Sequence, residues 1–356
     1  MKIGYFTLSD NNYGDARTPN DLLRHIMEEA ILADELGFAS AWIGEHHFNL
    51  FGTCPSPQLF LANLAARTSR VRLAPAVTLL PCRHPLQVAE EFALLDVLSE
   101  GRVDFAAGRG YDRREYEAFG VPFEQSADLF REGLDIVRRA WSEDTLSYQG
   151  QFYRFPEVSV SPRPVQRPHP PIYVACFSKP TMEMAAESGF HIIFAPFAAA
   201  MMFGSIQEAA AQFKALAAAH GHPDSQVMCS YFMHVCHNQR EVHAAKETLI
   251  RYFHSILPAF PSDPTTAPRH IAYFVDIVKR LQAMRPEDLT SKSMMFGKPD
   301  YCVDQLRQLA GEGIREVILY FNFGCQEHQA VMDNMKLFAR EVLPYIAERP
   351  PVSASR

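Results

Sequence analysis

Cysteine pairs at metal-binding or redox spacing are absent from this sequence. The seven cysteines include no Cys-x-x-Cys motif and are odd in number, which argues against structural zinc and favours a reduced compartment. No apolar run reaches the ~18 residues of a membrane-spanning helix, and the first residues lead into a strand-like segment without a signal peptide. We therefore expect a cytoplasmic protein with no membrane segment.

A basic stripe is absent as well. The 34 Lys and Arg residues and the 41 Asp and Glu residues are interspersed and give a net charge of −7, so the charge pattern of a nucleic-acid binder is missing. The chain has no Gly-x-x-x-x-Gly-Lys motif, and no Gly-x-Gly-x-x-Gly turn follows its first strand-like segment. We expect no nucleic-acid partner, and ATP is not the obvious ligand.

What the sequence does contain is a long alternation of strand-like and helix-like segments. Its 356 residues are 47% hydrophobic and 21% charged, an ordinary globular composition. The predicted strands are Lys2–Leu8, the segment beginning at Ser40, Val71–Leu80, Arg102–Ala107, Ile172–Cys176, His191–Phe194, Gln226–Cys236 and Glu316–Phe321. Strands separated by helices predict right-handed βαβ units and an α/β fold, a (β/α)8 TIM barrel. A doubly wound sheet is the structural alternative.

Two stretches interrupt this alternation. Residues 145–171 are rich in proline and aromatic residues. Residues 257–298 have three prolines in their first stretch and continue into a predicted helix over 270–284. We predict insertions after strands four and seven of a single domain, residues 1–350, followed by a disordered tail, 351–356. The second insertion is either a mobile lid over a site or an ordered structural element.

A carboxylate and two imidazoles, Glu45, His46 and His47, follow the second predicted strand. Alternation along a strand sends Glu45 and His47 one way and His46 the other. In (β/α)8 barrels the carboxyl ends of the strands carry the active site, so we predict a catalytic role for His46. The alternatives are that the three residues satisfy one another in a loop, or that they bind a metal. Adjacent residues splay apart, so we expect no metal site.

Other polar or unusual residues also follow predicted strands. They are Ala76, Val77 and Thr78 at the end of strand three, Arg109 after strand four, Phe177, Ser178 and Lys179 after strand five, and Asn322 after strand eight. Because the carboxyl ends of all barrel strands meet at one rim, we expect these residues to lie around the same opening.

Two of these loops have the chemistry of an anion site. Arg109 lies between Gly108 and Gly110, so the backbone can approach a ligand closely and the guanidinium can bind a phosphate through two hydrogen bonds. Ser178 and Thr181 bracket the start of a predicted helix and offer hydroxyl and N–H groups to an anion. Arg109 could equally be a solvated or ion-paired loop residue, and Ser178 and Thr181 could cap the helix.

Taken in order, these segments resemble the bacterial luciferase-like family of flavin-dependent monooxygenases. The resemblance runs from the first strand to the last helix. The motifs that carry it are Met1-Lys-Ile-Gly-Tyr-Phe, Trp42-Ile-Gly-Glu-His-His-Phe, Pro81-Cys-Arg-His-Pro85, Ala89-Glu-Glu, Leu94-Leu-Asp, Gly101-Arg-Val-Asp-Phe, Gly108-Arg-Gly-Tyr, Met335-Lys-Leu-Phe and Leu343-Pro-Tyr. This combination is specific for the superfamily but does not identify a substrate.

The resemblance assigns roles to residues around the expected rim. His46 corresponds to the family's active-site histidine beside the reactive edge of the flavin, and Ala76-Val77 to a non-proline cis peptide beneath the ring. Arg109 corresponds to the phosphate-binding arginine, with Gly110 and Tyr111 in the same loop.

A second phosphate loop is implied after strand five. The residues that fall in it are Cys176, Ser178, Lys179 and Thr181. Here Cys176-Phe-Ser-Lys-Pro replaces the more polar loop of luciferase itself, so the phosphate ligand could be a hydroxyl or an amine, with Lys179 as a candidate.

The resemblance also implies the chemistry. Reduced FMN (FMNH2) would serve as cosubstrate and react with O2 to give a C4a-hydroperoxide, which transfers one oxygen atom to the substrate while the protein orients the flavin and excludes water. A separate flavin reductase would supply FMNH2. A homodimer would form through the helices over 55–68 and 85–98, with Glu90 at the interface.

The substrate is expected to be small and lipophilic, such as an aldehyde. Phenylalanines that could line an apolar pocket are Phe6, Phe48, Phe177, Phe194 and Phe197. Two other functions stay open: hydride transfer by an enzyme that uses the deazaflavin F420, and a non-catalytic flavin-binding barrel that serves a partner.

Overall fold

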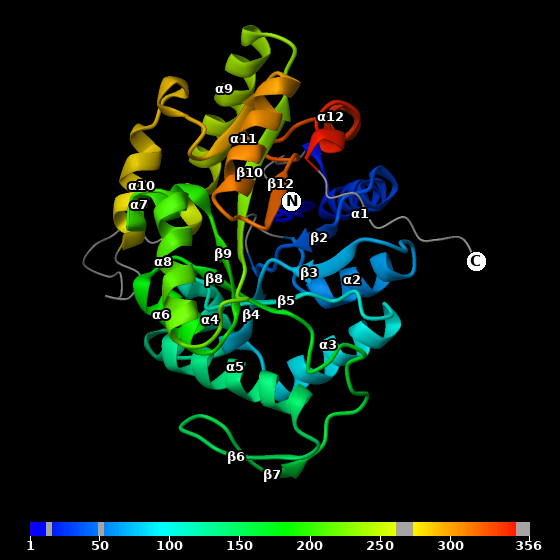
Figure 1. Cartoon of the computed structure of the whole chain (residues 1–356), viewed down its shortest axis with the longest axis vertical. Helices are drawn as coiled ribbons and strands as arrows, with labels where there is room; N and C mark the ends of the chain where they lie inside the picture. Colours follow the sequence, from blue (N-terminus) through cyan, green and yellow to red (C-terminus); the bar gives the residue numbers. More distant parts are fainter. Residues whose placement is uncertain (12–15, 49–52, 261–272, 347–356) are drawn as a thin grey trace.

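The first strand, β1 (Lys2–Thr7), lies between the second strand and the last strand of one parallel sheet (Figure 1). The computed structural model describes residues 1–11, 16–48, 53–260 and 273–346. From β1 the sheet continues one way through β2 (Ser40–Ile43) and β3 (Arg72–Pro75). The other way it continues through β12 (Glu316–Tyr320), β10 (Val227–Val235), β9 (His191–Phe194), β8 (Ile172–Cys176), β5 (Phe105–Gly108) and β4 (Thr78–Leu79).

The sheet closes on itself at the third strand. β3 and β4 are the two parts of the predicted strand Val71–Leu80, separated by a cis peptide bond between Ala76 and Val77. A parallel bridge between Leu73 and Val103 joins β3 to the segment that precedes β5. With β3 and β4 counted as one position, the path has eight positions in chain order. The predicted (β/α)8 barrel is confirmed, and the doubly wound alternative is wrong.

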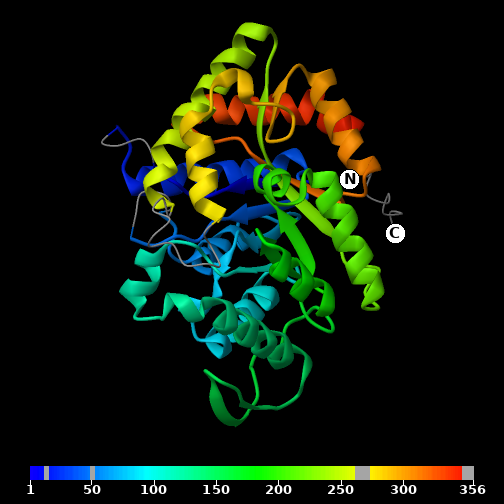
Figure 2. The same ribbon diagram turned by 90° about the vertical axis from the view of Figure 1, so that its left-hand side faces the viewer.

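Helices follow the strands and surround the barrel (Figures 1 and 2). They are α1 (Pro19–Leu36), α2 (Pro57–Ala65), α3 (Pro85–Leu98), α4 (Arg113–Phe119), α5 (Ser126–Ser142), α6 (Lys179–Glu187), α7 (Pro196–Phe203), α8 (Ile206–Ala219), α9 (Gln239–Ile256), α10 (Tyr273–Ala283), α11 (Pro299–Gly311) and α12 (His328–Glu341). α1 shows why the boundaries were predictable. Thr18 accepts a hydrogen bond from the backbone N–H of Asp21, and Gly37, with φ of 84°, ends the helix in the left-handed conformation.

Alternation along the strands separates an inner from an outer core. On β1, Phe6 packs inside the barrel with Ile318 and Tyr320 of β12, whereas its neighbour Tyr5 belongs to the core between sheet and helices. On β2, Trp42 packs inside and Ile43 outside in the same way. Inward-facing side chains near the carboxyl ends of these strands, such as Phe6 and Tyr320, line the cavity described below.

The first predicted insertion, residues 145–171, contains an antiparallel hairpin of β6 (Leu146–Gln149) and β7 (Arg154–Val158). It projects beyond α5, away from the barrel strands (Figures 1 and 2).

The second predicted insertion, residues 257–298, contributes a further strand to the sheet. β11 (Met294–Gly297) pairs in parallel with the last residues of β10, and it was not predicted from the sequence. Its four residues are apolar and all buried, so neither alternation nor length marked them as a strand. Residues 261–272 of the predicted lid and the predicted tail 351–356 lie outside the described residues. Over the ranges described above, we find no helix long and apolar enough to cross a membrane.

Candidate active site

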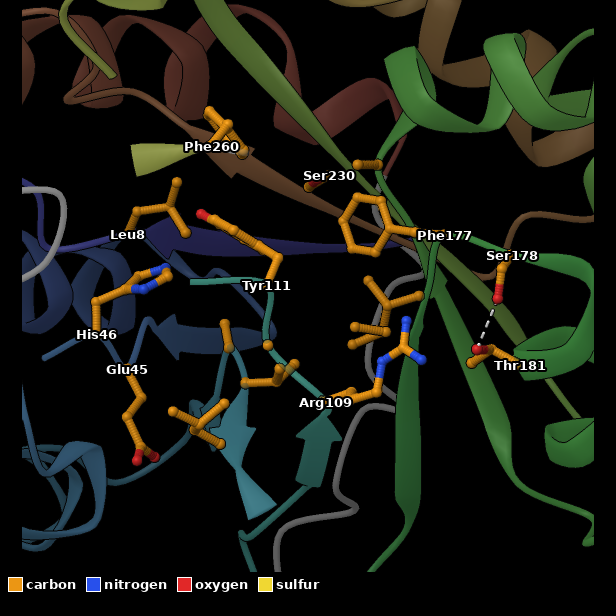
Figure 3. A pocket seen from close by; sticks show the side chains of 18 of the residues that line it. Leu8, Glu45, His46, Arg109, Tyr111, Phe177, Ser178, Thr181, Ser230 and Phe260 are labelled. Atoms are coloured by element: carbon orange, nitrogen blue, oxygen red, sulfur yellow. Dashed lines mark hydrogen bonds between the residues drawn. The ribbon is translucent and has the colours of Figure 1, made fainter. Parts of the chain in front are cut away.

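A cavity of about 660 Å³ lies at the carboxyl ends of the barrel strands. Eight of the predicted site residues line it, namely His46, Ala76, Val77, Arg109, Gly110, Tyr111, Ser178 and Thr181. Side chains from β1, from the loops after β2, β5 and β8, and from α5 and α9 meet around it. Most of its wall is apolar or aromatic, with polar groups gathered in a few places (Figure 3). Such a cavity has the size and character of a small-molecule site.

His46 is anchored by a buried carboxylate. Its Nδ1 lies 3.2 Å from Oε1 of Glu115, which belongs to α4 and also accepts a hydrogen bond of 2.8 Å from the backbone N–H of His47. Because Nδ1 is directed to Glu115, the other ring nitrogen, Nε2, lies on the opposite side of the ring. In Figure 3 the imidazole points toward Tyr111, and the two ring centroids are 5.8 Å apart. The pairing sets the tautomer and orientation of the ring.

Glu45 and His47 pair with each other apart from the His46 ring, although Glu45 also lines the cavity. Oε1 of Glu45 lies 3.1 Å from Nε2 of His47 and 3.7 Å from Nη1 of Arg83, and Figure 3 shows the Glu45 side chain diverging from the His46 ring. The idea that the three residues satisfy one another therefore holds for Glu45 and His47 but not for His46. Among the described parts of the chain there is no group of three or more His, Cys, Asp or Glu residues suited to a metal ion.

The two glycines beside Arg109 pack directly on the strand across from them. A Cβ atom added to Gly108 would lie 2.3 Å from Cγ2 of Val77, and one added to Gly110 would lie 2.3 Å from Cδ1 of Leu79. Gly110 also has φ of 76°, in the region that favours glycine. The loop backbone can therefore lie against the Ala76–Val77 segment, and the hydroxyl of Tyr116 donates to the carbonyl oxygen of Arg109. This packing fixes the position from which the guanidinium enters the cavity.

Arg109 and the start of α6 form one polar end of the cavity. Figure 3 shows the guanidinium on the same side as Ser178 and Thr181, whose hydroxyl oxygens are 3.0 Å apart. Ser178 is the N-cap residue of α6, yet its side chain makes no capping hydrogen bond. Capping therefore does not occupy this hydroxyl. Arg131 of α5 lines the same cavity and was not predicted. Hydroxyls, a helix N-terminus and guanidinium groups together suit a phosphate.

Cys176 and Lys179 do not line the cavity. Cys176 is buried on the outer side of β8, where its thiol donates to the carbonyl oxygen of Ser178 at 3.3 Å. Burial raises the pKa of this thiol to about 12, so it stays protonated. The Lys179 side chain is exposed at the first position of α6. Helix geometry explains why Lys179 lies outside the cavity, because Ser178 and Thr181 are one turn apart on the side of α6 that faces it.

Of the predicted phenylalanines, Phe6 and Phe177 line the cavity. Phe194 packs in the outer core, because it alternates with Ile193, the residue of β9 that faces inward. Phe48 is 68% exposed and rests against Phe119. Placing Phe48 and Phe194 in the pocket was therefore wrong. The side chain of Phe197 lies outside the described part of the structure.

Two other residues expected at the rim lie elsewhere. Thr78 is fully buried, and within the described residues its hydroxyl has no hydrogen-bond partner. Asn322 turns outward and donates to Glu29 of α1 at 2.7 Å. Neither contributes to the cavity wall.

The wall near β1 and β12 contains groups that the sequence did not single out. Tyr320 stacks on Phe232, with ring centroids 5.5 Å apart and an interplanar angle of 25°, and Tyr252 lies beside both. Behind them is Asp10, which accepts a hydrogen bond from the Tyr320 hydroxyl. Burial raises the pKa of Asp10 to about 6. No motif marks Asp10, because its importance comes from residues more than two hundred positions away in the chain.

The chain is similar to known proteins over most of its length. The family model described as luciferase-like monooxygenase matches residues 1–316. The chain is 27% identical over 365 residues to the alkanal monooxygenase alpha chain of a Kryptophanaron alfredi symbiont, covering 98% of this chain and 99% of that one. It is 24% identical over 343 residues to the oxygenase component of flavin-dependent trigonelline monooxygenase from Acinetobacter baylyi, covering 94% and 92%.

Solved structures show the same barrel. Monooxygenase RslO1 from Streptomyces bottropensis has a TM-score of 0.79 at 28% identity, covering 98% of this chain and all of that one. At 19% and 17% identity, two more distant structures show the fold alone. They are a 3,6-diketocamphane monooxygenase component in complex with FMN, with a TM-score of 0.74, and an F420-dependent secondary alcohol dehydrogenase, with a TM-score of 0.72. Each covers 98% of this chain and 99% of its own. Because the family model matches most of its length, the chain belongs to the luciferase-like monooxygenase family.

Proposed function

We propose that this chain is the oxygenase of a two-component system that uses FMNH2 and O2 to add one oxygen atom to a small lipophilic substrate, such as an aldehyde. The observation that carries the proposal is the cavity itself. It combines a phosphate-compatible end at Arg109, Ser178 and Thr181 with an anchored imidazole at His46 and an aromatic wall.

The donor set fits a flavin mononucleotide. The guanidinium of Arg109, the hydroxyls of Ser178 and Thr181 and the first N–H groups of α6 would hold the phosphate. Ala76 and Val77 line the cavity, and Val77 packs on Gly108 without room for a Cβ, so this segment would lie beside the ring. When bound, reduced FMN supplies the electrons that activate O2.

The chain's own contribution is to position, to move protons and to exclude water. His46, oriented by Glu115, can accept a proton at Nε2 from the substrate side and return it. The aromatic residues of the wall, including Phe6, Phe177 and Phe232, keep the reacting atoms away from solvent. Their apolar character also supports a lipophilic substrate.

A separate reductase is proposed as the source of FMNH2. The Acinetobacter relative carries the name of an oxygenase component, and the sequence here has no Gly-x-Gly-x-x-Gly turn for a nicotinamide cofactor. A homodimer is also proposed. The exposed large apolar side chains include Leu59 on α2 and Leu94, Val97 and Leu98 on α3, which form the surface expected to pair, and Glu90 is exposed on the same helix α3.

F420-dependent hydride transfer is the second candidate. Its support is the fold shared with the F420-dependent alcohol dehydrogenase. A non-catalytic flavin-binding role has less support, because the buried carboxylate of Glu115 orients the His46 ring, which a passive binder would not need.

The test begins with an anaerobic titration of the chain with FMNH2 and, separately, with reduced F420. Oxygen and a panel of aldehydes are then added while O2 uptake is recorded. We expect saturable binding of FMNH2 and aldehyde-dependent O2 uptake. Substrate reduction by reduced F420 without O2 uptake would overturn the proposal in favour of hydride transfer. Binding of FMNH2 without any turnover would favour the passive role.

A further inference from the structure

Ser230 is a hydroxyl side chain on the inner face of β10. Along this strand Cys229 and Tyr231 belong to the core between sheet and helices, whereas Met228 and Phe232 pack inside the barrel. Alternation therefore directs Ser230 inward, and it lines the cavity (Figure 3). Its two neighbours in the chain are buried, but Ser230 itself is partly exposed. Because β10 lies between β9 and β12 in the closed sheet, the surface that Ser230 exposes belongs to the cavity.

The wall around Ser230 is apolar. Its partner across the sheet is Ile318 of β12, and Ile318, Phe232 and Ile193 of β9 all line the cavity. Within the described residues, the Ser230 hydroxyl makes no hydrogen bond. In small-molecule sites, a few polar groups placed in an apolar wall set the orientation of the ligand. The Ser230 hydroxyl has the surroundings of such a group.

Several other polar groups of the cavity wall already have partners. The pairs are His46 with Glu115 at 3.2 Å, the hydroxyl of Tyr320 with Asp10, and the hydroxyl of Ser293 with the carbonyl oxygen of Thr290 at 3.4 Å. Arg109, Ser178 and Thr181 form the end proposed for the phosphate. Ser230 differs from these groups, because its hydroxyl can donate to a ligand without giving up a bond within the protein.

The strand that carries Ser230 lies across the barrel from the segment proposed to lie beside the flavin ring. Between the position of β3 and β4 and that of β10, the closed path passes through β2, β1 and β12 one way and through β5, β8 and β9 the other way. A ring with one face beside Ala76 and Val77 would therefore turn its other face toward β10. The substrate must approach that second face, so Ser230 borders the space in which it would bind.

We propose that the Ser230 hydroxyl donates a hydrogen bond to the carbonyl oxygen of the substrate, which makes Ser230 a specificity-determining residue for carbonyl compounds. This inference rests on the proposed function, because it places the substrate between the flavin and β10. When an oxygen nucleophile adds to a carbonyl carbon, the electron pair of the C=O π bond moves onto the oxygen. A donor already in place stabilises the charge that develops there.

The test uses NMR titration with a medium-chain methyl ketone labelled with ¹³C at its carbonyl, which shifts downfield when the carbonyl oxygen accepts a hydrogen bond. The chain is titrated with oxidised FMN present at saturation and again without flavin. The bound carbonyl should lie downfield in the wild type and in Ser230→Thr, which keeps the hydroxyl. In Ser230→Ala it should move upfield, and ketone affinity should fall about 2- to 10-fold, the effect of losing one neutral hydrogen bond.

Ser293→Ala is the matched control, because Ser293 also lines the cavity but its hydroxyl already donates to Thr290. It should leave the carbonyl resonance and the ketone affinity unchanged. FMN affinity, measured in the same variants, separates the substrate from the carbonyl groups of the flavin ring, and Ser230→Ala should leave it unchanged.

Four results would overturn the inference. They are a bound carbonyl resonance that is the same in Ser230→Ala and the wild type, an equal upfield movement in Ser293→Ala, a loss in Ser230→Ala confined to FMN binding, and no ketone binding by the wild type with or without flavin. Because oxidised FMN does not turn the ketone over, the titration is independent of oxygenation. An intact Ser230 effect without aldehyde oxygenation would count against the proposed oxygenase function alone, and oxygenation without a Ser230 effect against this inference alone.

Discussion

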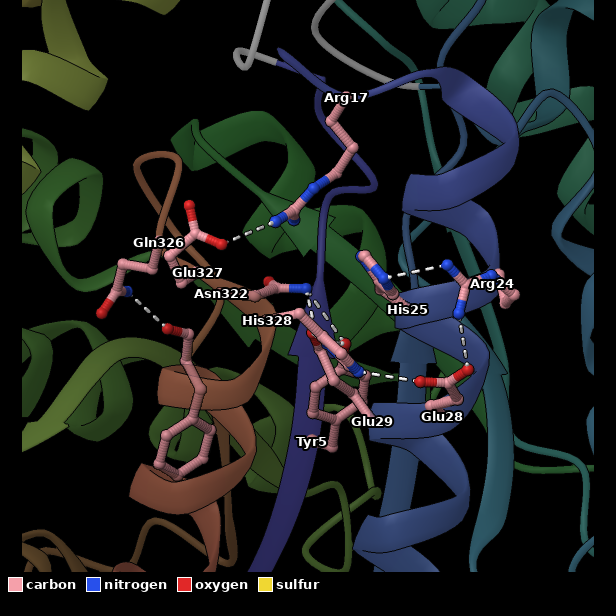
Figure 4. Close-up of polar contacts among 11 residues, drawn as sticks. Tyr5, Arg17, Arg24, His25, Glu28, Glu29, Asn322, Gln326, Glu327 and His328 are labelled. Atoms are coloured by element: carbon pink, nitrogen blue, oxygen red, sulfur yellow. Dashed lines mark hydrogen bonds and ion pairs between the residues drawn. The ribbon is translucent and has the colours of Figure 1, made fainter.

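Two buried carboxylates in this barrel each accept a hydrogen bond from a tyrosine, yet their surroundings differ. Glu29, on the outer side of the sheet, accepts from the Tyr5 hydroxyl at 2.7 Å and from Nδ2 of Asn322 at 2.7 Å, and lies 3.0 Å from Nδ1 of His328 (Figure 4). Asp10, behind the inner wall, faces the hydroxyls of Tyr320 and Tyr252.

The Glu29 cluster is built as a structural joint. Nε2 of His328 lies 2.9 Å from Glu28, so one imidazole at the start of α12 bridges two carboxylates of α1. The ring of His25 stacks on it at a centroid distance of 4.1 Å. The hydrogen bond to Glu29 and, to a smaller extent, the one to Glu28 raise the pKa of His328. This cluster links the first and last helices where β1 and β12 pair, and we call it the seam.

The different surroundings of Glu29 and Asp10 indicate different roles for the two buried carboxyl groups. Where donors and a cation surround it, the carboxylate stabilises the fold. Where tyrosine hydroxyls at a cavity wall face it and burial raises its pKa to about 6, the carboxyl keeps its proton to a higher pH than usual and is suited to function. Tyr5 and Phe6 are adjacent in the sequence, yet the first belongs to the seam and the second to the cavity.

The largest expected effect is a loss of activity in a cavity variant that a seam variant does not share. His46→Ala should lower product formation by about 10² to 10⁴-fold, because it removes the proton-transferring group, while FMNH2 binding stays nearly unchanged. His328→Ala should leave product formation per folded molecule unaffected. Turnover and anaerobic flavin titration of both variants measure this. Equal turnover by His46→Ala and the wild type would remove His46 from the mechanism.

A smaller effect is expected at the phosphate end. Arg109→Ala should weaken FMNH2 binding about 10- to 100-fold, since charged hydrogen bonds to a phosphate are lost. The matched control is Arg113→Ala, which removes an arginine four residues away that pairs with Glu117 and Glu124 outside the cavity. Lys179→Ala should also bind normally. Calorimetry under anaerobic conditions measures all three, and a larger loss in Lys179→Ala than in Arg109→Ala would contradict the assignment.

The seam should contribute to the free energy of unfolding. His328→Ala should lower the free energy of unfolding by about 1 to 2 kcal/mol, because the buried Glu29 carboxylate loses a donor. Urea unfolding at pH 6 measures the change. His243→Ala is the control, since His243 pairs with Glu247 on an exposed helix surface and its loss should leave stability nearly unchanged. If both variants unfold at the same urea concentration as the wild type, the seam contributes nothing measurable.

The smallest expected effect is a difference between the pH ranges in which His328 and Asp10 contribute to stability. The folded-state pKa of His328 is raised above 6.5 by its hydrogen bonds to Glu29, so its contribution to stability is complete below pH 6.5 and is lost as pH rises through the higher folded value. For Asp10 the pKa rises through burial from 3.8 to about 6. The contribution of its protonated form to stability is therefore complete below pH 3.8 and is lost as pH rises from 3.8 to 6. Unfolding of His328→Ala and Asp10→Asn as a function of pH should show each variant diverging from the wild type in its own window. Overlapping windows would contradict the contrast.

Much of this arrangement was predictable from local sequence. Helix boundaries at Thr18 and Gly37, the barrel order of the strands and the opposite directions of Glu45 and His46 all follow from capping, periodicity and alternation, which act between neighbours. What could not be predicted depends on contacts distant in the chain. Glu115 meets His46 across 69 positions and Tyr320 meets Asp10 across 310, and no local pattern records such pairs.

The proposed oxygenation is tested most directly with ¹⁸O2. The chain is supplied with FMNH2 and a medium-chain aldehyde under labelled oxygen, and the product is examined by mass spectrometry. The account predicts a carboxylic acid that carries one ¹⁸O atom, in an amount that falls sharply in His46→Ala. A product without the label, formed at the same rate by both proteins, would contradict it.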